Sequence, residues 1–187
     1  MIVKNNKNFT VVLISLLQKV FMELLDVYDI NNNKTGKTVL RGDKNLSEGE
    51  FIKLVVIWIE DDGKYLVQKC SEDKGSVFAI TGGHTTSGNT ATTQAVIEIQ
   101  EELGVEIKEE DLKQLGIITI KNAMFEVYIL KDKIKQDTKL VLQESEVESV
   151  SWLDREQIEN LIKNGVFRKS SQMHYEKFIK GNNNGEK

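Results

Sequence analysis

The sequence predicts an α/β protein in which several strands accompany one prominent acidic helix. The run 51–60, FIKLVVIWIE, is apolar almost throughout, which is typical of a central strand buried on both faces. Residues 91–103 carry apolar side chains at helical spacing, between a threonine and a glycine. With 187 residues, 40% of them hydrophobic, the chain can bury one sizeable core.

Residues 1–21 differ from the remainder of the chain. They contain a short apolar run after a lysine- and asparagine-rich start, and Val11, Ile14 and Leu17 have helical spacing. The run is too short to span a bilayer, and no small-residue cleavage site follows it. We expect a helical extension packed on the domain or on a partner. The alternative is a translated leader, with Met22 as the natural start.

The β pattern begins at Leu24 and continues to the acidic helix. Two strand-like runs flank an asparagine-rich turn and predict a hairpin, and Asp61-Asp62-Gly63 predicts a tight turn after the central strand. The strands expected before the helix are 24–30, 37–42, 51–60, 64–70 and the short 77–81.

Strands and two further helical segments are expected after the acidic helix. The expected strands are 112–121, 124–131, 147–153 and a short edge strand at 140–143. Asp154 is expected to cap a helix, 155–164, that ends at Gly165. A last helical segment is expected at 172–180, followed by a disordered tail at 181–187. No repeat or linker divides 22–180, so we expect one domain there.

The acidic helix carries three carboxylates on one face. Thr90 is expected as its N-cap, and Gly104 as the residue where the chain leaves the helix in a left-handed conformation. Glu98, Glu101 and Glu102 are related by i, i+3 and i+4, so they fall within a narrow arc. Like charges repel there, and the helix dipole disfavours anions near a C-terminus. Mg²⁺ or Mn²⁺ would relieve both penalties, because hard divalent cations prefer oxygen ligands.

Charge and cysteine content exclude several classes of function. The net charge of −4 argues against binding of bulk nucleic acid, which requires a basic face. A small phosphorylated ligand is compatible with that charge, because a bound cation supplies positive charge locally. The single cysteine, Cys70, excludes an internal disulfide and agrees with a reducing cytoplasm. We expect a cytoplasmic protein without a membrane partner, in which the N-terminal segment and first hairpin could support a homodimer.

Segment 83–105 resembles the Nudix box, G-x5-E-x7-R-E-U-x-E-E-x-G-U, where U is apolar. Gly83 matches the first glycine, and IEIQEELGV at 97–105 matches the end of the box. The stretches ELLDVYDINNNKTG and ESEVESVSWLDREQIENLIKNG are similar to Nudix proteins related to isopentenyl-diphosphate isomerase. The resemblance implies an α/β/α sandwich around a mixed sheet, with the box helix beside the sheet.

The same resemblance implies a metal-dependent hydrolase. Hydrolysis of a phosphoanhydride requires neutralised phosphoryl oxygens and an activated water. In the family, glutamates at the positions of Glu101 and Glu102 are metal ligands, and the glutamate at Glu98 is a ligand or a general base. The implied metal-binding set is Gly83, Glu98, Glu101 and Glu102, with Mg²⁺ or Mn²⁺ as the cofactor.

Two positions depart from the box. Asn89 stands where a glutamate is expected, and Ile97 stands where the family has an arginine that orients the catalytic glutamate. Orienting roles of this kind are often worth about 10- to 100-fold. Asn89 can coordinate through its carbonyl oxygen but brings no charge. We hypothesise that Gln94 replaces the arginine by donating a hydrogen bond to Glu98 at i+4.

Four further residues are weaker candidates. His84 follows the glycine pair, where the related isomerases place a ligand histidine, and the alternative is a plain turn residue. Glu126 aligns approximately with an isomerase carboxylate, and the alternative is a surface position of an alternating strand. Glu144 and Glu146 lie in the loop from which the family often supplies a fourth carboxylate, and the alternative is a solvated acidic loop.

Three functions follow from these residues. The leading one is metal-dependent hydrolysis of a phosphoanhydride in a nucleoside diphosphate linked to another moiety. The second is a catalytically weak or inactive Nudix domain that binds a nucleotide-like ligand or a partner, as Asn89 and Ile97 would favour. The third is isomerisation of isopentenyl diphosphate, which is disfavoured because those isomerases carry a catalytic cysteine where this chain has Gly82.

Overall fold

A mixed β-sheet crosses the middle of the protein. The computed structural model describes residues 23–43 and 45–181. The strands within these residues are β1 (Leu24–Tyr28), β2 (Lys34–Leu40), β3 (Phe51–Asp61), β4 (Lys64–Cys70), β5 (Phe78–Ala79), β6 (Leu112–Ile120), β7 (Ala123–Lys131) and β8 (Val147–Leu153). Their main path is β2-β1-β3-β4-β5. β7 pairs in parallel with β3, whereas β6 and β8 pair in antiparallel fashion with β7 and β4.

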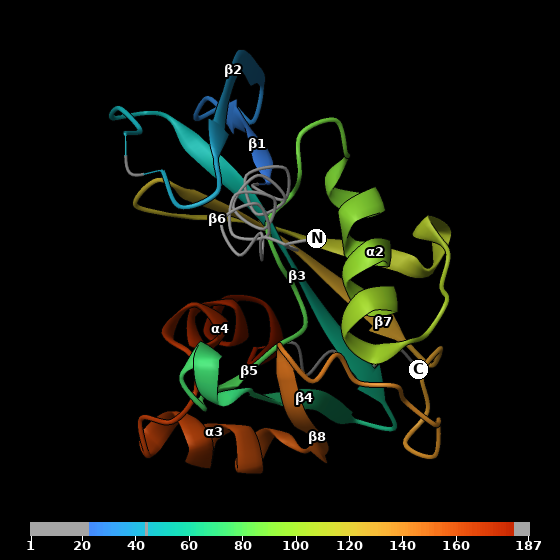
Figure 1. Ribbon diagram of the computed structural model, residues 1–187. Coiled ribbons are helices and arrows are strands. Elements are labelled where there is room, and N and C mark those ends of the chain that lie inside the picture. Colours follow the sequence, from blue (N-terminus) through green and yellow to red (C-terminus); the bar gives the residue numbers. More distant parts are fainter. Residues whose placement is uncertain (1–22, 44, 182–187) are drawn as a thin grey trace, which may run out of the picture.

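Helices cover both faces of this sheet, which confirms the predicted α/β/α sandwich. The α-helices are α2 (Ala91–Leu103), α3 (Arg155–Lys163) and α4 (Lys169–His174), which continues into a π-helical turn, Tyr175–Ile179. Figure 1 shows α2 beside β3 and β7, with α3 and α4 beside β4, β5 and β8. Among the residues that the structure describes, no helix is long and apolar enough to cross a membrane.

β3 is buried on both faces, as its apolar run predicts. Val55 and Ile57 point toward α2, while Val56 and Trp58 point toward α3 and the segment after α4. Burying one such side chain stabilises the fold by about 1.5–3 kcal/mol. The partners on the α2 face include Ala95, Ile99 and Leu103, and those on the opposite face include Ile158, Phe167 and Tyr175. The rigid pairing of β3 with α2 positions the acidic end of the helix.

The segment 81–85, which we call the glycine segment, runs along β3. The Val55 N–H donates to the Gly83 carbonyl at 2.9 Å, and the Ile57 N–H donates to the Thr81 carbonyl at the same distance. Gly82 has φ 155°, and a Cβ there would overlap the backbone of Val55. Because the chain crosses from β4 to β3 at this point, the predicted strand 77–81 is reduced to the two residues of β5.

The ends of α2 and α3 agree with the predicted caps. The Thr90 hydroxyl accepts the Thr93 N–H, and Gly104 has φ 69°. Asp154 and Gln157 form a reciprocal capping box at the start of α3. These local side-chain contacts fix both helix starts within one residue of the expected positions.

The predicted edge strand at 140–143 is wrong. This segment is irregular, and its N–H groups bond to the end of α2: Val141 donates to the Leu103 carbonyl at 2.9 Å, and Gln143 donates to the Glu102 carbonyl at 3.2 Å. The last carbonyls of a helix lack partners within the helix, so they capture the passing chain. The predicted extension at 1–21 lies outside the described residues, as does the 181–187 tail apart from Gly181.

Acid should destabilise the protein through His174. Its ring is fully buried, lies 4.9 Å from the Phe125 ring, and has no hydrogen-bond partner among the described residues. Burial lowers the pKa of His174 to about 4. The unfolded imidazole, with a pKa of about 6.5, binds more protons in the window between these values. Stability contributed by His174 is therefore present above pH 6.5 and is lost as the pH falls, by about 2 kcal/mol at pH 5.

His174→Phe should remove this part of the pH dependence. Urea unfolding at pH 7 and pH 5 measures the drop in the free energy of unfolding for each protein. We expect a smaller drop in the variant than in the parent chain. Because other titrating groups are shared by both proteins, an equal drop in the two would contradict the assignment.

Candidate active site

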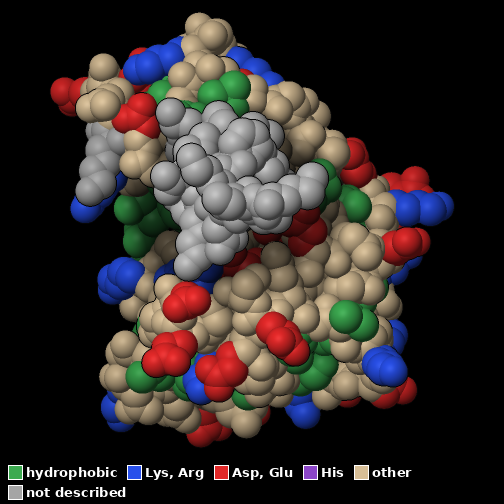
Figure 2. All heavy atoms as spheres, in the orientation of Figure 1, with side chains coloured by type: hydrophobic (Ala, Val, Ile, Leu, Met, Phe, Trp, Pro, Cys, Tyr) green, Lys and Arg blue, Asp and Glu red, His purple; other side chains and the backbone are tan. Residues whose placement is uncertain are grey.

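A cavity of about 330 Å³ lies between the glycine segment and α2. Carboxylates from three parts of the chain line it, namely Glu23, Glu98, Glu101, Glu102 and Glu146. Figure 2 shows acidic side chains recessed near the middle of the face in view. The three glutamates on the helix face thus meet Glu146, from the loop before β8, and Glu23, which precedes β1.

Glu98 is held between α2 and the glycine segment. A Cβ on Gly83 would overlap the Glu98 carboxyl group, so glycine at this position leaves room for that carboxyl. Gln94 Nε2 donates a hydrogen bond to Glu98 Oε1 at 2.9 Å, as the i+4 spacing predicts. Burial raises the pKa of Glu98 to about 7, although the bond from Gln94 opposes the rise.

The orientation of the Gln94 amide is fixed by three donors on its oxygen. Oε1 accepts the Thr86 N–H at 3.1 Å, the Thr86 hydroxyl at 3.0 Å and Asn89 Nδ2 at 3.0 Å. An oxygen with three donors around it leaves only the NH₂ group to face Glu98. Asn89 stands where the family box has a glutamate. Its contact with Gln94 therefore orients Gln94, and Gln94 in turn orients Glu98.

Glu102 is the most buried carboxylate of the cavity, with 7% of the residue exposed. Gln68 Nε2, from the middle of β4, donates to Glu102 Oε2 at 2.8 Å, and the nearby Gly82 N–H favours the charged form of this carboxyl. Burial raises the pKa of Glu102 to about 8, and the nearby Glu98 adds to the rise. These fixed donors hold the side chain in one position in the cavity.

The oxygen atoms that could act as metal ligands in the cavity fit a hard divalent cation. The side-chain acceptors around the cavity are carboxylate and amide oxygens, which Mg²⁺ and Mn²⁺ prefer. Among the described residues no three His, Cys, Asp or Glu side chains are already gathered at metal-binding distances. The raised pKa values of Glu98 and Glu102 mean that protons occupy oxygens for which a cation would compete.

Some of the other predicted site residues line the cavity, and others lie away from it. Gly83 lines the cavity, but its carbonyl already accepts the Val55 N–H, which leaves one lone pair free. Glu146 lines the cavity and pairs with Lys74 at 2.7 Å. Glu144 does not line it; its side chain faces a separate surface hollow near Glu72. Of the two loop candidates, only Glu146 is placed to act.

Glu126 and His84 also lie away from the carboxylate cavity. Glu126 is buried and pairs with Lys53 at 3.2 Å, while the Tyr128 hydroxyl donates to it at 2.6 Å. This buried, fully paired carboxylate is neither a surface residue nor a cavity residue. The backbone of His84 forms an isolated antiparallel β-bridge with Leu54, and His84 lines an adjoining cavity. Burial, with a contribution from the nearby Arg41, lowers the pKa of His84 to about 4.

Sequence reasoning missed three residues of the site. Glu23 and Arg41 line the cavity and pair at 2.8 Å because the β1–β2 hairpin brings them together. No sequence spacing relates these two residues to the helix. Gln68 carried a usable signal, because a polar side chain that follows the apolar run YLV of an expected strand needs a hydrogen-bond partner when it is buried.

Fold and site together define an α/β/α protein with a carboxylate-lined cavity beside a glycine segment. The NUDIX domain family model matches residues 52–174. The chain therefore belongs to the NUDIX family of hydrolases.

Sequence relatives agree with this family. An uncharacterized Nudix hydrolase of Listeria monocytogenes is 30% identical over 151 residues, which covers 78% of this chain and 88% of that protein. Nudix hydrolase 3 of Arabidopsis thaliana is 27% identical over 158 residues, which covers 75% of this chain but 20% of that protein.

The fold recurs in solved structures. The crystal structure of DR0079 from Deinococcus radiodurans superposes with a TM-score of 0.66 at 21% identity, covering 81% of this chain and 96% of that one. A bifunctional NMN adenylyltransferase/ADP ribose pyrophosphatase from Francisella tularensis, complexed with AMP and a Mn ion, gives a TM-score of 0.52 at 12% identity. That match covers 67% of this chain and 41% of the other.

Proposed function

We propose that this chain hydrolyses a phosphoanhydride in a nucleoside diphosphate linked to another moiety, with Mg²⁺ or Mn²⁺ as cofactor. The observation that carries the proposal is the cavity in which Glu98, Glu101 and Glu102 meet beside the glycine segment. Membership of the NUDIX family supports the reaction type. The Mn ion and AMP in the Francisella tularensis structure motivate the choice of metal and nucleotide for assays.

Five residues that line the cavity have roles in the proposed reaction. Glu98, Glu101 and Glu102 would hold the cation, with Glu146 at the rim. Such a cation neutralises phosphoryl oxygens and lowers the pKa of bound water. Glu98 would also be placed to accept a proton from the attacking water, because its carboxyl group lines the same cavity. Gln94 occupies one oxygen of Glu98 and leaves the other for that task.

Two other functions have weaker support. Ligand binding with little turnover is favoured by Ile97, which lines the cavity as an apolar residue where the family has an arginine. The Gln94 amide supports the hydrolase instead, because it supplies a donor to Glu98 by another route. Isomerisation is disfavoured by Gly82, where even a Cβ would overlap the backbone of β3.

A panel of phosphoanhydrides separates the three functions. The purified chain is incubated with nucleoside triphosphates, dinucleoside polyphosphates and nucleoside diphosphate sugars, with Mg²⁺, Mn²⁺ or EDTA. We expect release of a nucleoside monophosphate or phosphate that EDTA abolishes. Binding without turnover of any compound would favour the weak or inactive domain. Conversion of isopentenyl to dimethylallyl diphosphate would favour the isomerase.

A further inference from the structure

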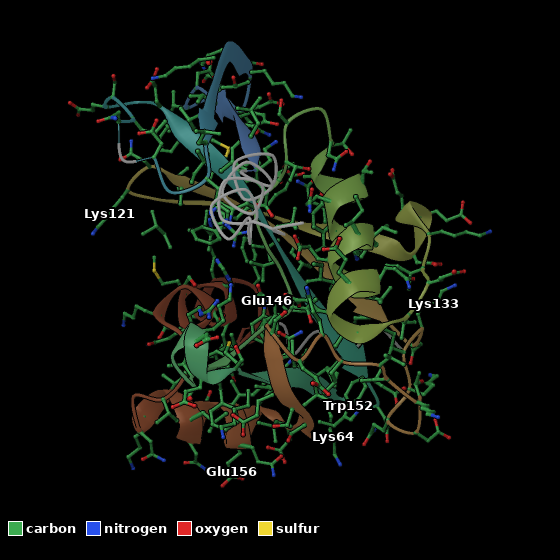
Figure 3. The ribbon with its side chains drawn as sticks, viewed as in Figure 1. Lys64, Lys121, Lys133, Glu146, Trp152 and Glu156 are labelled. Atoms are coloured by element: carbon green, nitrogen blue, oxygen red, sulfur yellow. The ribbon has the colours of Figure 1, made fainter. Side chains whose placement is uncertain are left out.

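A second cavity, of about 160 Å³, adjoins the carboxylate cavity. The residues that line both cavities are Arg41, Gly82, Gly83, Glu102 and Glu146. Figure 3 labels Glu146 near the centre of the molecule, between α4 and α2. The two cavities therefore form one continuous hollow. Its acidic end is the carboxylate cavity, and its second end is the smaller cavity. The second end is lined by the cations Arg41, Lys74 and Arg168.

Buried side chains close the second end from behind. Cys70, Ala79 and Ile80 line it and are each less than one-tenth exposed. Burial raises the pKa of the Cys70 thiol, so this floor is uncharged at neutral pH. His84 also lines the cavity. The three long cationic side chains supply the positive charge at this end, where the carboxylates Glu102 and Glu146 also line the cavity.

Arg168 is held in place by its backbone. Its N–H donates to the Phe78 carbonyl at 2.7 Å, and the Phe78 N–H donates to the Val166 carbonyl at 2.9 Å, so the turn after α3 is joined to β5. The guanidinium Nη2 donates to Cys70 Sγ at 3.3 Å. A thiol sulfur is a weak acceptor. Within 23–43 and 45–181, no ion pair between Arg168 and a carboxylate is present.

The two other cations have exchangeable partners. Lys74 pairs with Glu146, and their side chains are 35% and 34% exposed. Arg41 pairs with Glu23, and theirs are 43% and 38% exposed. Exposed pairs of this kind contribute little to stability, so an incoming anion can take the place of either carboxylate at small cost. Either carboxylate is then available to the acidic end of the hollow.

We propose that Arg41, Lys74 and Arg168 bind a terminal phosphate group of the substrate. The inference rests on the proposed hydrolysis at the neighbouring carboxylates. Arginine presents two parallel N–H groups that match phosphate oxygens. A cavity of about 160 Å³ is smaller than the roughly 300–1,000 Å³ that encloses a drug-sized ligand, so a phosphate group fits and a second nucleoside does not. The other moiety of the substrate is then phosphate, as in a nucleoside triphosphate.

Pyrophosphate binding without metal tests the proposal. Inorganic pyrophosphate is titrated into the full chain in EDTA by calorimetry, for the parent, Arg168→Gln, Arg168→Lys, Lys74→Gln and Lys64→Gln. Lys64, labelled in Figure 3, is the matched control, because it is exposed at the start of β4. Cys70, which lines the second cavity, is at the other end of that strand. We expect about tenfold weaker binding for Arg168→Gln and Lys74→Gln, partial recovery for Arg168→Lys, and no change for Lys64→Gln. Added salt should weaken binding by the parent.

The possible outcomes separate this site from the proposed hydrolysis. Equal affinities in the parent, Arg168→Gln and Lys74→Gln would overturn the phosphate site, as would pyrophosphate binding that requires a divalent metal. The hydrolase would stand in either case if metal-dependent turnover is observed. Loss of pyrophosphate affinity in the variants, without turnover of any phosphoanhydride, would support the phosphate site and reject the hydrolase. An increase in KM caused by Arg168→Gln for nucleoside triphosphates, but not for dinucleoside polyphosphates, would support the substrate class.

Discussion

Replacing Glu102 with glutamine should reduce metal-dependent hydrolysis by about 10²- to 10³-fold while leaving the protein folded. Glutamine keeps the size of a side chain that lies between Gln68 and the glycine segment, but it removes the charge available to a cation. Glu110→Gln is the matched control, because that side chain is 76% exposed and lies outside the cavity. Steady-state rates with Mg²⁺ check the prediction, and a Glu102→Gln enzyme with the parental kcat would contradict it.

The same variant should change how stability depends on pH. Burial raises the pKa of Glu102 to about 8 from a usual value of 4.5, so the folded state binds the extra proton between these values. The stability contributed by this group is therefore full below pH 4.5 and is lost as the pH rises through about 8. Urea unfolding in EDTA at pH 6 and pH 9 should show a smaller loss for Glu102→Gln than for the parent. Equal losses would show that Glu102 ionises normally in the folded protein.

Replacing Gln94 with leucine should lower kcat by about 10- to 100-fold, with a smaller effect on KM. Leucine removes the donor to Glu98 and leaves the Thr86 and Asn89 donors without their acceptor. Gln94→Glu is a second variant, which keeps an acceptor for those donors but replaces the donor to Glu98 with a second carboxylate, so kcat should fall here too and the pKa of Glu98 should rise further. Gln100→Leu, on the exposed side of α2, is the matched control.

Restoring the residues of the family box should rescue the Gln94 variant. We expect Asn89→Glu with Ile97→Arg to return part of the lost kcat in the Gln94→Leu background, because arginine supplies the missing donor to the catalytic glutamate. Parental activity in Gln94→Leu itself would reject the orienting role. Loss of kcat without any rescue would indicate that Gln94 acts through the folded structure of the loop instead.

Local signals in the sequence predicted the part of the site that lies on one helix. The spacing of Glu98, Glu101 and Glu102, together with the caps at Thr90 and Gly104, placed the carboxylates on one face because these contacts involve neighbours along the chain. The bond from Gln94 to Glu98 follows from the same i, i+4 geometry.

Contacts between distant segments could not be predicted in this way. Glu126 lies within β7, and a position in a strand does not show that Lys53 on β3 would pair with it. The pairing of Arg41 with Glu23 depends on the register of a hairpin, and Arg168 reaches the cavity through a turn joined to β5. The irregular course of 140–143 depends on the free carbonyls of α2, which strand propensity does not describe.

Direct binding of Mn²⁺ tests the central claim, that the carboxylate cavity holds a divalent cation. The electron paramagnetic resonance signal of free Mn²⁺ is followed as the metal-free chain is added at pH 8 and at pH 6. We predict that the parent and Glu110→Gln remove the free signal, that Glu98→Gln and Glu102→Gln remove far less, and that binding weakens at pH 6 because protons compete for the same oxygens. An unchanged free signal with the parent chain, or equal binding by Glu102→Gln, would contradict the claim.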